Sequence, residues 1–95
     1  MLIDWTDAAK ADALAALEYI AQDNLNAAYG VYEEIGRQVA MLAEHPKPGR
    51  AGRMKGTREL VIGRTPYIVV YRIRGEAVQI IRVLHGARQW PKRFP

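Results

Sequence analysis

Two residues near the C-terminal end of the sequence could act on a phosphate group. Histidine gains and loses a proton near neutral pH, so His85 could serve as a general base. Arg88 follows three residues later, and its guanidinium can bind a phosphate or pair with a partner's carboxylate. The alternative for His85 is a hydrogen-bonded structural histidine at a strand end. These two residues alone therefore do not define an active site.

The basic residues are concentrated in the second half of the sequence. Residues 1–46 contain two basic and eight acidic side chains, a net charge of −6, whereas residues 47–95 contain twelve basic and two acidic side chains, a net charge of +10. This bias predicts a basic face that meets an anion, either nucleic acid or an acidic protein segment. The alternative is a basic surface that only keeps the protein soluble. Four arginines in strand-like segments are candidate anchors or solvated side chains: Arg58, Arg72, Arg74 and Arg82.

Length and composition exclude several classes of function. A chain of 95 residues predicts one domain spanning residues 1–95. The absence of cysteine excludes a disulfide and a thiolate nucleophile. The two histidines, His45 and His85, fall on separate predicted elements and make a poor metal site, so we expect no metal and no cofactor. No apolar run approaches the roughly 20 residues of a membrane span, and the N-terminus does not resemble a signal peptide. We therefore expect a cytoplasmic protein without a membrane partner.

The strongest structural signal lies in the second half of the chain. Residues 58–62, 67–74 and 77–84 are rich in β-branched and aromatic side chains and predict three consecutive antiparallel strands. Gly63 and Gly75 lie in the two short connections, where glycine makes a tight turn inexpensive. One face of this sheet is expected to pack on helices, and the other to be partly covered by the C-terminal tail or by a partner.

The first half of the chain predicts a short strand and two helices. Residues 1–5 alternate weakly, and Thr6 or Asp7 can cap a helix that runs to about residue 23. A second helix is expected over residues 25–44, with an apolar stripe that includes Ile35 and Val39. The short linker between the helices predicts an antiparallel hairpin. Pro46 is expected to end the second helix, and residues 46–56 form a basic, glycine-rich loop without the spacing of a P-loop.

The chain resembles the RelE/ParE superfamily of bacterial toxins from type II toxin–antitoxin systems. The resemblance rests on G-T-R-E-L at residues 56–60, P-Y-I-V-V-Y-R at residues 66–72 and V-Q-I-I-R-V-L-H-G-A-R-Q-W at residues 78–90, preceded by the helix hairpin. It covers essentially the whole chain. It implies an α+β fold in the order β-α-α-β-β-β, with an antiparallel sheet packed on an N-terminal helical hairpin.

The superfamily contains two kinds of toxin, and the sequence favours one of them. RelE-type members are ribosome-dependent mRNA endoribonucleases, whereas ParE-type members are described as DNA gyrase poisons. Where the resemblance implies two lysines on the first strand of a RelE nuclease, this chain has Glu59 and Val61. An expected arginine is replaced by Ile68, the terminal tyrosine falls near Phe94, and only Arg88 matches. Since most of the charge that stabilises the cleaved phosphate is missing, the resemblance implies a ParE-like, non-enzymatic inhibitor of DNA gyrase.

Two alternatives to a gyrase-directed toxin stay open. The first is a ribosome-dependent endoribonuclease of RelE type that acts on mRNA through Arg64, His85 and Arg88. The second is a toxin that has lost its activity and only binds an antitoxin.

All three interpretations imply a cognate antitoxin as partner. By resemblance it is a ParD-like ribbon-helix-helix protein with an acidic tail that folds on binding. The residues expected at partner interfaces are Arg58, Tyr67, Arg72, Arg82, Arg88 and Trp90. For Trp90, the alternative is that the indole only covers the edge of the sheet.

Overall fold

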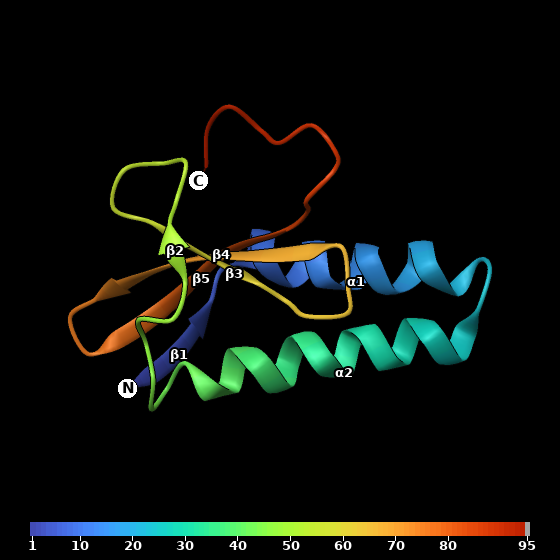
Figure 1. Ribbon diagram of the computed structural model, residues 1–95, viewed down its shortest axis with the longest axis horizontal. Helices are drawn as coiled ribbons and strands as arrows, with labels where there is room; N and C mark the ends of the chain where they lie inside the picture. The colour runs from blue at the N-terminus through green and yellow to red at the C-terminus, as the bar shows by residue number, and fades with distance from the viewer. Residues whose placement is uncertain (95) are drawn as a thin grey trace.

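Two helices lie against one face of a five-stranded sheet, and a loop and the C-terminal tail lie on its other side (Figure 1). The computed structural model describes residues 1–94. The elements follow the order β1 (Leu2–Trp5), α1 (Asp7–Ala21), α2 (Leu25–Met41), β2 (Arg50–Ala51), β3 (Arg58–Val61), β4 (Tyr67–Arg74) and β5 (Ala77–His85). The predicted α+β order is confirmed, and β2 is an additional strand.

The strand order in the sheet is β1-β5-β4-β3-β2. Strands β3, β4 and β5 form the predicted antiparallel run, and β4 has the predicted bounds. The first strand differs from the rest because β1 runs parallel to β5, with Leu2 opposite Ala77 and Trp5 opposite Ile80. The helix hairpin carries the chain from β1 to the opposite edge of the sheet. Strands β3, β4 and β5 then lead back across the sheet until β5 lies beside β1. The sheet is therefore mixed, with one parallel pair at its edge.

The short strand β2 lies inside the segment expected to be only a loop. Arg50 pairs with Glu59, and Ala51 pairs with Arg58. The buried phenol of Tyr71 fixes the preceding turn, because its oxygen accepts a hydrogen bond from Gly49 N at 2.9 Å and donates one to Pro46 O at 2.9 Å. A Cβ at residue 49 would come within 2.7 Å of the Tyr71 ring, so this close approach requires glycine. The basic loop is thus held firmly against β4.

Side-chain caps set the starts of both helices. Thr6 accepts a hydrogen bond from Ala9 N at the start of α1, and Asn24 accepts one from Ala27 N at the start of α2. The helix α1 ends at Ala21 rather than near residue 23. The helix α2 ends at Met41 rather than at residue 44, because the chain continues in a turn in which His45 N donates to Met41 O before Pro46.

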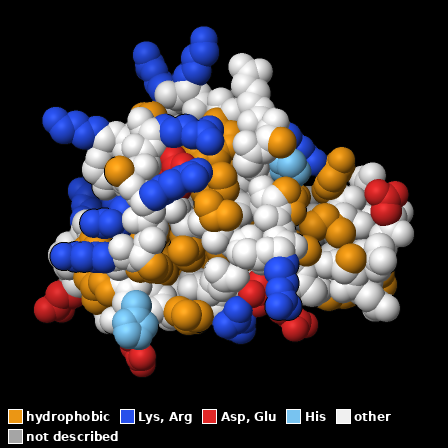
Figure 2. Space-filling view, viewed as in Figure 1, with side chains coloured by type: hydrophobic (Ala, Val, Ile, Leu, Met, Phe, Trp, Pro, Cys, Tyr) orange, Lys and Arg blue, Asp and Glu red, His pale blue; other side chains and the backbone are white. Residues whose placement is uncertain are grey.

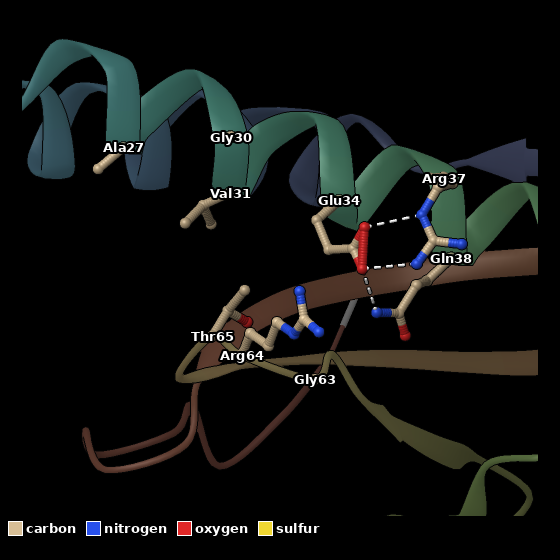
Figure 3. Close-up of a pocket in the computed structure, with 9 residues that line it drawn as sticks. All are labelled: Ala27, Gly30, Val31, Glu34, Arg37, Gln38, Gly63, Arg64 and Thr65. Carbon is tan, nitrogen blue, oxygen red and sulfur yellow. Dashed lines mark hydrogen bonds and ion pairs between the residues drawn. The ribbon is translucent and has the colours of Figure 1, made fainter.

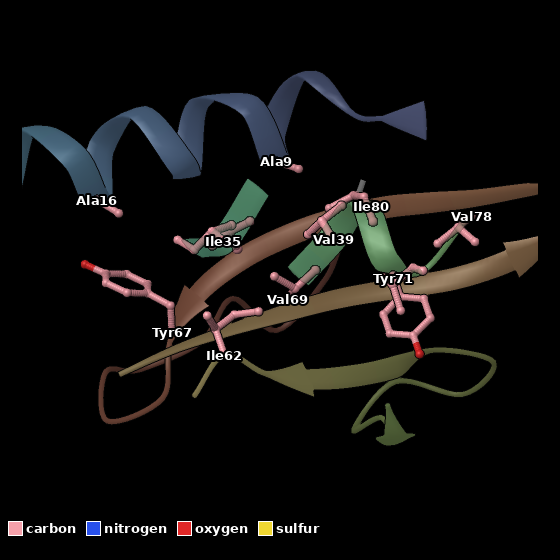
Figure 4. Close-up of a cluster of buried hydrophobic side chains, with 12 residues drawn as sticks. Ala9, Ala16, Ile35, Val39, Ile62, Tyr67, Val69, Tyr71, Val78 and Ile80 are labelled. Atoms are coloured by element: carbon pink, nitrogen blue, oxygen red, sulfur yellow. The ribbon is translucent and has the colours of Figure 1, made fainter. Parts of the chain in front are cut away.

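The hydrophobic core lies between the helix hairpin and one face of the sheet (Figure 4). Ile35 and Val39 of α2 are buried together with Val69 of β4, as the apolar stripe predicted. Ala9 and Ala16 of α1 complete the cluster, and their small side chains allow the helix to approach the sheet closely. One face of each helix is therefore buried in the core.

The opposite face of the sheet is covered by the chain itself. Ile68, Val70 and Ile81 are buried although they do not belong to the core cluster between the helices and the sheet. The β2–β3 loop and the C-terminal tail lie on this side (Figure 1), and they are joined by the guanidinium of Arg53, which lies 3.6 Å from the ring centroid of Trp90. Among residues 1–94, neither helix is both long and apolar enough to cross a membrane.

Candidate functional site: a basic and aromatic surface

The end of the β4–β5 pair carries an aromatic cluster that includes His85. The ring of His85 meets the ring of Tyr67, its register partner, edge to face with the centroids 5.5 Å apart. Its Nδ1 accepts a hydrogen bond from Ala87 N at 3.1 Å, and its carbonyl oxygen accepts one from Trp90 Nε1 at 3.0 Å. These contacts fix the first residues of the tail. These contacts agree equally well with a structural role and with a functional role for His85.

A small pocket of about 160 Å³ opens beside this cluster. His85, Arg88 and Trp90 line it together with residues of α1. The guanidinium of Arg88 lies 4.2 Å from the ring centroid of Tyr19, an α1 residue that the sequence analysis did not select. Burial raises the pKa of Tyr67 above its usual value of 10, and the nearby positive charge of Arg88 opposes this rise. The pocket thus combines one guanidinium, one imidazole and two larger aromatic side chains, those of Tyr67 and Trp90.

Arg64 lies away from this pocket, in the turn between β3 and β4. It has a positive φ of 68°, a conformation that costs energy for a residue with a side chain. It lines a separate groove of about 650 Å³ between the turn and α2 (Figure 3). In this structure Arg64 therefore lines a different hollow from His85 and Arg88, and their common role in a nuclease site stays a prediction. The reason is that the turn lies against α2, whereas His85 and Arg88 lie beside α1.

The groove beside Arg64 contains an ion pair on α2. The carboxylate of Glu34 accepts hydrogen bonds from Arg37 Nε at 2.7 Å and from Gln38 Nε2 at 2.8 Å. The bonds from Arg37 and Gln38 lower the pKa of Glu34 from 4.5 to about 2, and the charge of Arg64 adds to this effect. Glu34 is thus already satisfied by its own helix.

Arg82 forms an internal ion pair with α1. Its guanidinium donates two hydrogen bonds to Asp12, at 2.6 and 2.9 Å, and Asp12 also accepts one from Val83 N at 2.9 Å. The register between β4 and β5 shifts at this point, where Val70 pairs with Arg82 and Tyr71 with Ile80. Asp12 therefore binds both the side chain of Arg82 and the backbone of Val83 beside the register shift, and its hydrogen bonds raise the pKa of Arg82. The side chain of Arg82 is 21% exposed, and its charge is neutralised inside the molecule.

Glu59 on β3 is a second residue with an internal role. It is 3% exposed, and its carboxylate accepts hydrogen bonds from Arg53 N at 2.8 Å and from Arg50 Nη2 at 3.2 Å. Arg53, whose Nε lies 3.9 Å from the same carboxylate, stacks on Trp90. Glu59 therefore connects β3, the β2–β3 loop and the tail. Sequence reasoning missed this role, although an isolated acidic residue among so many arginines was a usable signal.

Arg58 and Arg72 are held by neutral acceptors. A terminal nitrogen of Arg58 donates to Gly49 O at 3.0 Å, and Arg72 Nε donates to Gln79 Oε1 at 2.7 Å. Neither contact cancels the positive charge, so both guanidiniums remain available to an anion.

The predicted partner-binding residues therefore occupy three kinds of environment. Arg58, Arg72, Arg88 and Trp90 reach the surface, where Arg88 is exposed and the other three are partly buried. Tyr67 is 3% exposed because its ring packs into the core, and Arg82 is paired with Asp12. These two residues consequently have structural roles in this conformation. Within residues 1–94, no group of three His, Cys, Asp or Glu side chains is placed to hold a metal ion.

Comparisons with known proteins agree with the fold and with the sequence pattern. Residues 3–90 match the family described as "ParE toxin of type II toxin-antitoxin system, parDE". The Sinorhizobium fredii protein named "Putative toxin Y4kP" is 49% identical over 74 residues, which cover 78% of this chain and 76% of that protein. "Toxin RelE2" of Caulobacter vibrioides is 36% identical over 84 residues, covering 88% of this chain and 93% of that protein.

The fold also matches a solved toxin–antitoxin structure. A chain of the "Chromosomal ParDE TA system from P. aeruginosa" superposes with a TM-score of 0.80 and 28% sequence identity, and the match covers 90% of this chain and 95% of that chain. The match to the family extends over nearly all of the described elements, from β1 to Trp90. The chain therefore belongs to the ParE toxin family of type II toxin–antitoxin systems, within the RelE/ParE superfamily.

Proposed function

We propose that this toxin inhibits growth by poisoning DNA gyrase and that it is not a nuclease. The observation that carries the proposal is the identity and environment of Glu59 and Val61. They occupy the positions at which the resemblance implies lysines in a RelE nuclease. Glu59 is a buried carboxylate neutralised by Arg50 and Arg53, and Val61 is an apolar side chain that is 51% exposed. Neither can stabilise the negative charge that develops on a phosphate during cleavage, since that task needs hydrogen-bond donors or cations.

The separation of the remaining candidates supports the same proposal. Acid–base cleavage of RNA needs a base and a charge-stabilising group within hydrogen-bond reach of one phosphate. Arg64 lines the groove against α2, whereas His85 and Arg88 line the small pocket beside Trp90. The geometry thus offers no convergent set of three groups.

Controlled expression in a bacterial host tests this proposal. We expect induction of the DNA-damage response while transcripts stay intact, since a gyrase poison breaks DNA and leaves mRNA uncut. Rapid loss of mRNA before any DNA-damage response would contradict the proposal.

One observation favours the second candidate, a ribosome-dependent endoribonuclease. The pocket of about 160 Å³ places the imidazole of His85 near the guanidinium of Arg88, so a base and a phosphate-binding group share one site. This candidate predicts specific mRNA cuts on translating ribosomes that His85→Ala and Arg88→Ala each abolish. Transcripts that stay whole after induction of the wild-type protein would exclude it.

A type II toxin implies an antitoxin as partner, and we propose where it binds. Arg58, Arg72, Arg88 and Trp90 present three positive charges and one indole at the surface, which suits a ParD-like, acidic, partly apolar tail. Tyr67 and Arg82 lie behind this surface and support it. Reversing the charge of Arg58, Arg72 and Arg88 together should prevent rescue of growth by the antitoxin. Full rescue of a toxic triple variant would refute this interface.

A further inference from the structure

Positive charge gathers over one end of the sheet, around β2. We define the basic surface by six side chains: Lys47, Arg50, Lys55, Arg58, Arg72 and Arg74. The pairing of β3 with β4 places Arg58 opposite Tyr71, so its side chain leaves the sheet on the face opposite to that of Arg72. The pairing of β2 with β3 brings Arg50 to the same end of the sheet. Figure 2 shows Lys and Arg side chains gathered on the side of the molecule that holds β2 and its loops.

The basic surface is nearly free of compensating carboxylates. Between residues 47 and 95 the sequence has only Glu59 and Glu76. Glu59 is buried, and its single charge is shared by two arginines, Arg50 and Arg53, so it does not neutralise both. Glu76 lies in the turn between β4 and β5. The other acidic residues all precede residue 47, in the part of the chain that forms β1 and the helix hairpin.

Several of these cations are held in place without losing their charge. Arg58 donates to the carbonyl oxygens of Lys47 and Gly49, and Arg72 donates to Gln79. On β4, Arg72 and Arg74 are two residues apart and project from one face, about 7 Å from each other. Guanidiniums that are already positioned lose less conformational entropy when they bind an anion.

The surface offers charge rather than apolar area. Ile68, Val70 and Ile81, which lie beneath the loop and the tail, are already buried. A polypeptide segment that folds on binding needs apolar surface to offset its ordering entropy. A nucleic acid backbone does not, because its affinity comes mainly from release of counterions by cationic side chains. The features of the surface thus suit a phosphate backbone.

We propose that the basic surface binds the phosphate backbone of duplex DNA. This inference rests on the proposed function in one respect: it identifies the ligand as the DNA that gyrase holds. The toxin would then contact the nucleic acid as well as the enzyme in the complex that it poisons.

Anisotropy titrations of a labelled duplex DNA of arbitrary sequence, at several salt concentrations and without gyrase, test the surface itself. If about four phosphates are contacted, log K should fall with log salt with a slope of about −4. The double variant Arg72→Gln/Arg74→Gln should weaken binding about tenfold or more and reduce the slope by about 2. Binding should depend little on DNA sequence.

A matched control separates local charge from net charge. Lys10→Gln/Arg37→Gln removes the same charge from the two helices and should leave DNA affinity within about twofold. Equal losses in the two double variants, or no measurable DNA binding by the wild type, would overturn the proposal. Circular dichroism of both variants checks that they are folded.

A gyrase cleavage assay with the same proteins distinguishes this inference from the proposed function. Reduced trapping of cleaved DNA by the β4 variant, but not by the helix variant, supports both. Undiminished trapping by a β4 variant that no longer binds DNA would refute the inference and leave the proposed function standing. DNA binding by a wild type that traps no cleaved DNA would support the surface and refute the proposed function.

Discussion

Glu59 joins three parts of the chain that lie apart in the sequence. Its carboxylate binds the backbone of Arg53 and the guanidinium of Arg50, and Arg53 in turn covers Trp90. A buried carboxylate in these surroundings is stable only while its hydrogen bonds are intact. Glu59, which occupies a position where the resemblance implies a lysine in a RelE nuclease, therefore also holds the outer sheet face together.

Replacing Glu59 should cost measurable stability. Glu59→Ala removes the acceptor of a part-buried backbone N–H and the partner of two arginines, so we expect the free energy of unfolding to fall by about 1–3 kcal/mol. Glu76→Ala, in the exposed β4–β5 turn, is the control and should change it by less than about 0.5 kcal/mol. Urea denaturation measures both. Equal stability of Glu59→Ala and the wild type would show that the carboxylate does not hold the loop.

The Asp12–Arg82 pair should behave as one unit. Asp12→Ala leaves a half-buried guanidinium and Val83 N without an acceptor, so a loss of about 2–3 kcal/mol is expected. Arg82→Met alone should lower the free energy of unfolding by less than Asp12→Ala does. The double variant should lower it by less than the sum of the two single variants, because it leaves no unpaired charge. A double-mutant cycle by denaturation measures the coupling. Strict additivity would argue against a direct interaction.

Glu34 should make the stability of the protein depend on pH, and the direction of this dependence follows from its hydrogen-bond partners. Since its pKa in the folded protein is about 2, below the usual 4.5, its contribution to stability is complete above about pH 4.5 and is lost as the pH falls through about 2. A carboxyl NMR titration should find Glu34 still ionised at pH 3.5. In Arg37→Gln the titration should move up toward 4.5. A wild-type Glu34 that titrates near 4.5 would contradict the observed pairing.

At the scale of elements, α1 is joined to the sheet through its N-cap residue, Thr6. Thr6 Oγ1 accepts a hydrogen bond from Ala9 N and donates one to Ile81 O at 2.8 Å, so the helix cap also satisfies the edge of β5. Asn24 caps α2 in the same way but is exposed and makes no bond to the sheet. The two caps thus have the same local geometry and different tertiary roles.

This difference predicts unequal effects of two similar substitutions. Thr6→Ala should lower the free energy of unfolding by about 2 kcal/mol, because a cap and a strand contact are both lost. Asn24→Ala should lower it by about 1 kcal/mol, the ordinary value of a cap. Thr6→Ser should restore most of the loss. Thermal unfolding ranks the variants, and equal losses for Thr6→Ala and Asn24→Ala would mean that the bond to Ile81 contributes nothing.

The elements also show why sequence reasoning succeeded in some places and failed in others. Strand β4 was predicted with its bounds because local alternation and turn residues define it. The two-residue strand β2 has no such pattern and exists only because Tyr71 and Glu59 hold its loop. Likewise, Asp12 and Arg82 are 70 residues apart, and nothing local links them. The separation of Arg64 from His85 also depends on the path of the chain across the sheet, which residue types do not encode.

For the whole molecule, the division of charge follows the division of the fold. The acidic residues 1–46 form β1 and the helix hairpin, and the basic residues 47–95 supply the rest of the sheet, its loops and the tail. A molecule with one strongly cationic side is steered toward polyanions and binds them in a salt-dependent way. An antitoxin tail that occupies Arg58 and Arg72 would displace DNA from the same surface, which links neutralisation to competition for these cations.

The most direct test of gyrase poisoning uses purified gyrase, plasmid DNA and the purified toxin. After the complexes are denatured and digested with protease, we expect linear plasmid to accumulate with increasing toxin, because cleaved DNA is trapped on the enzyme. Folded toxin in excess that leaves supercoiling unchanged and produces no linear plasmid would contradict the account. Cleavage of mRNA on ribosomes by the same preparation would then assign the activity to the pocket of His85 and Arg88.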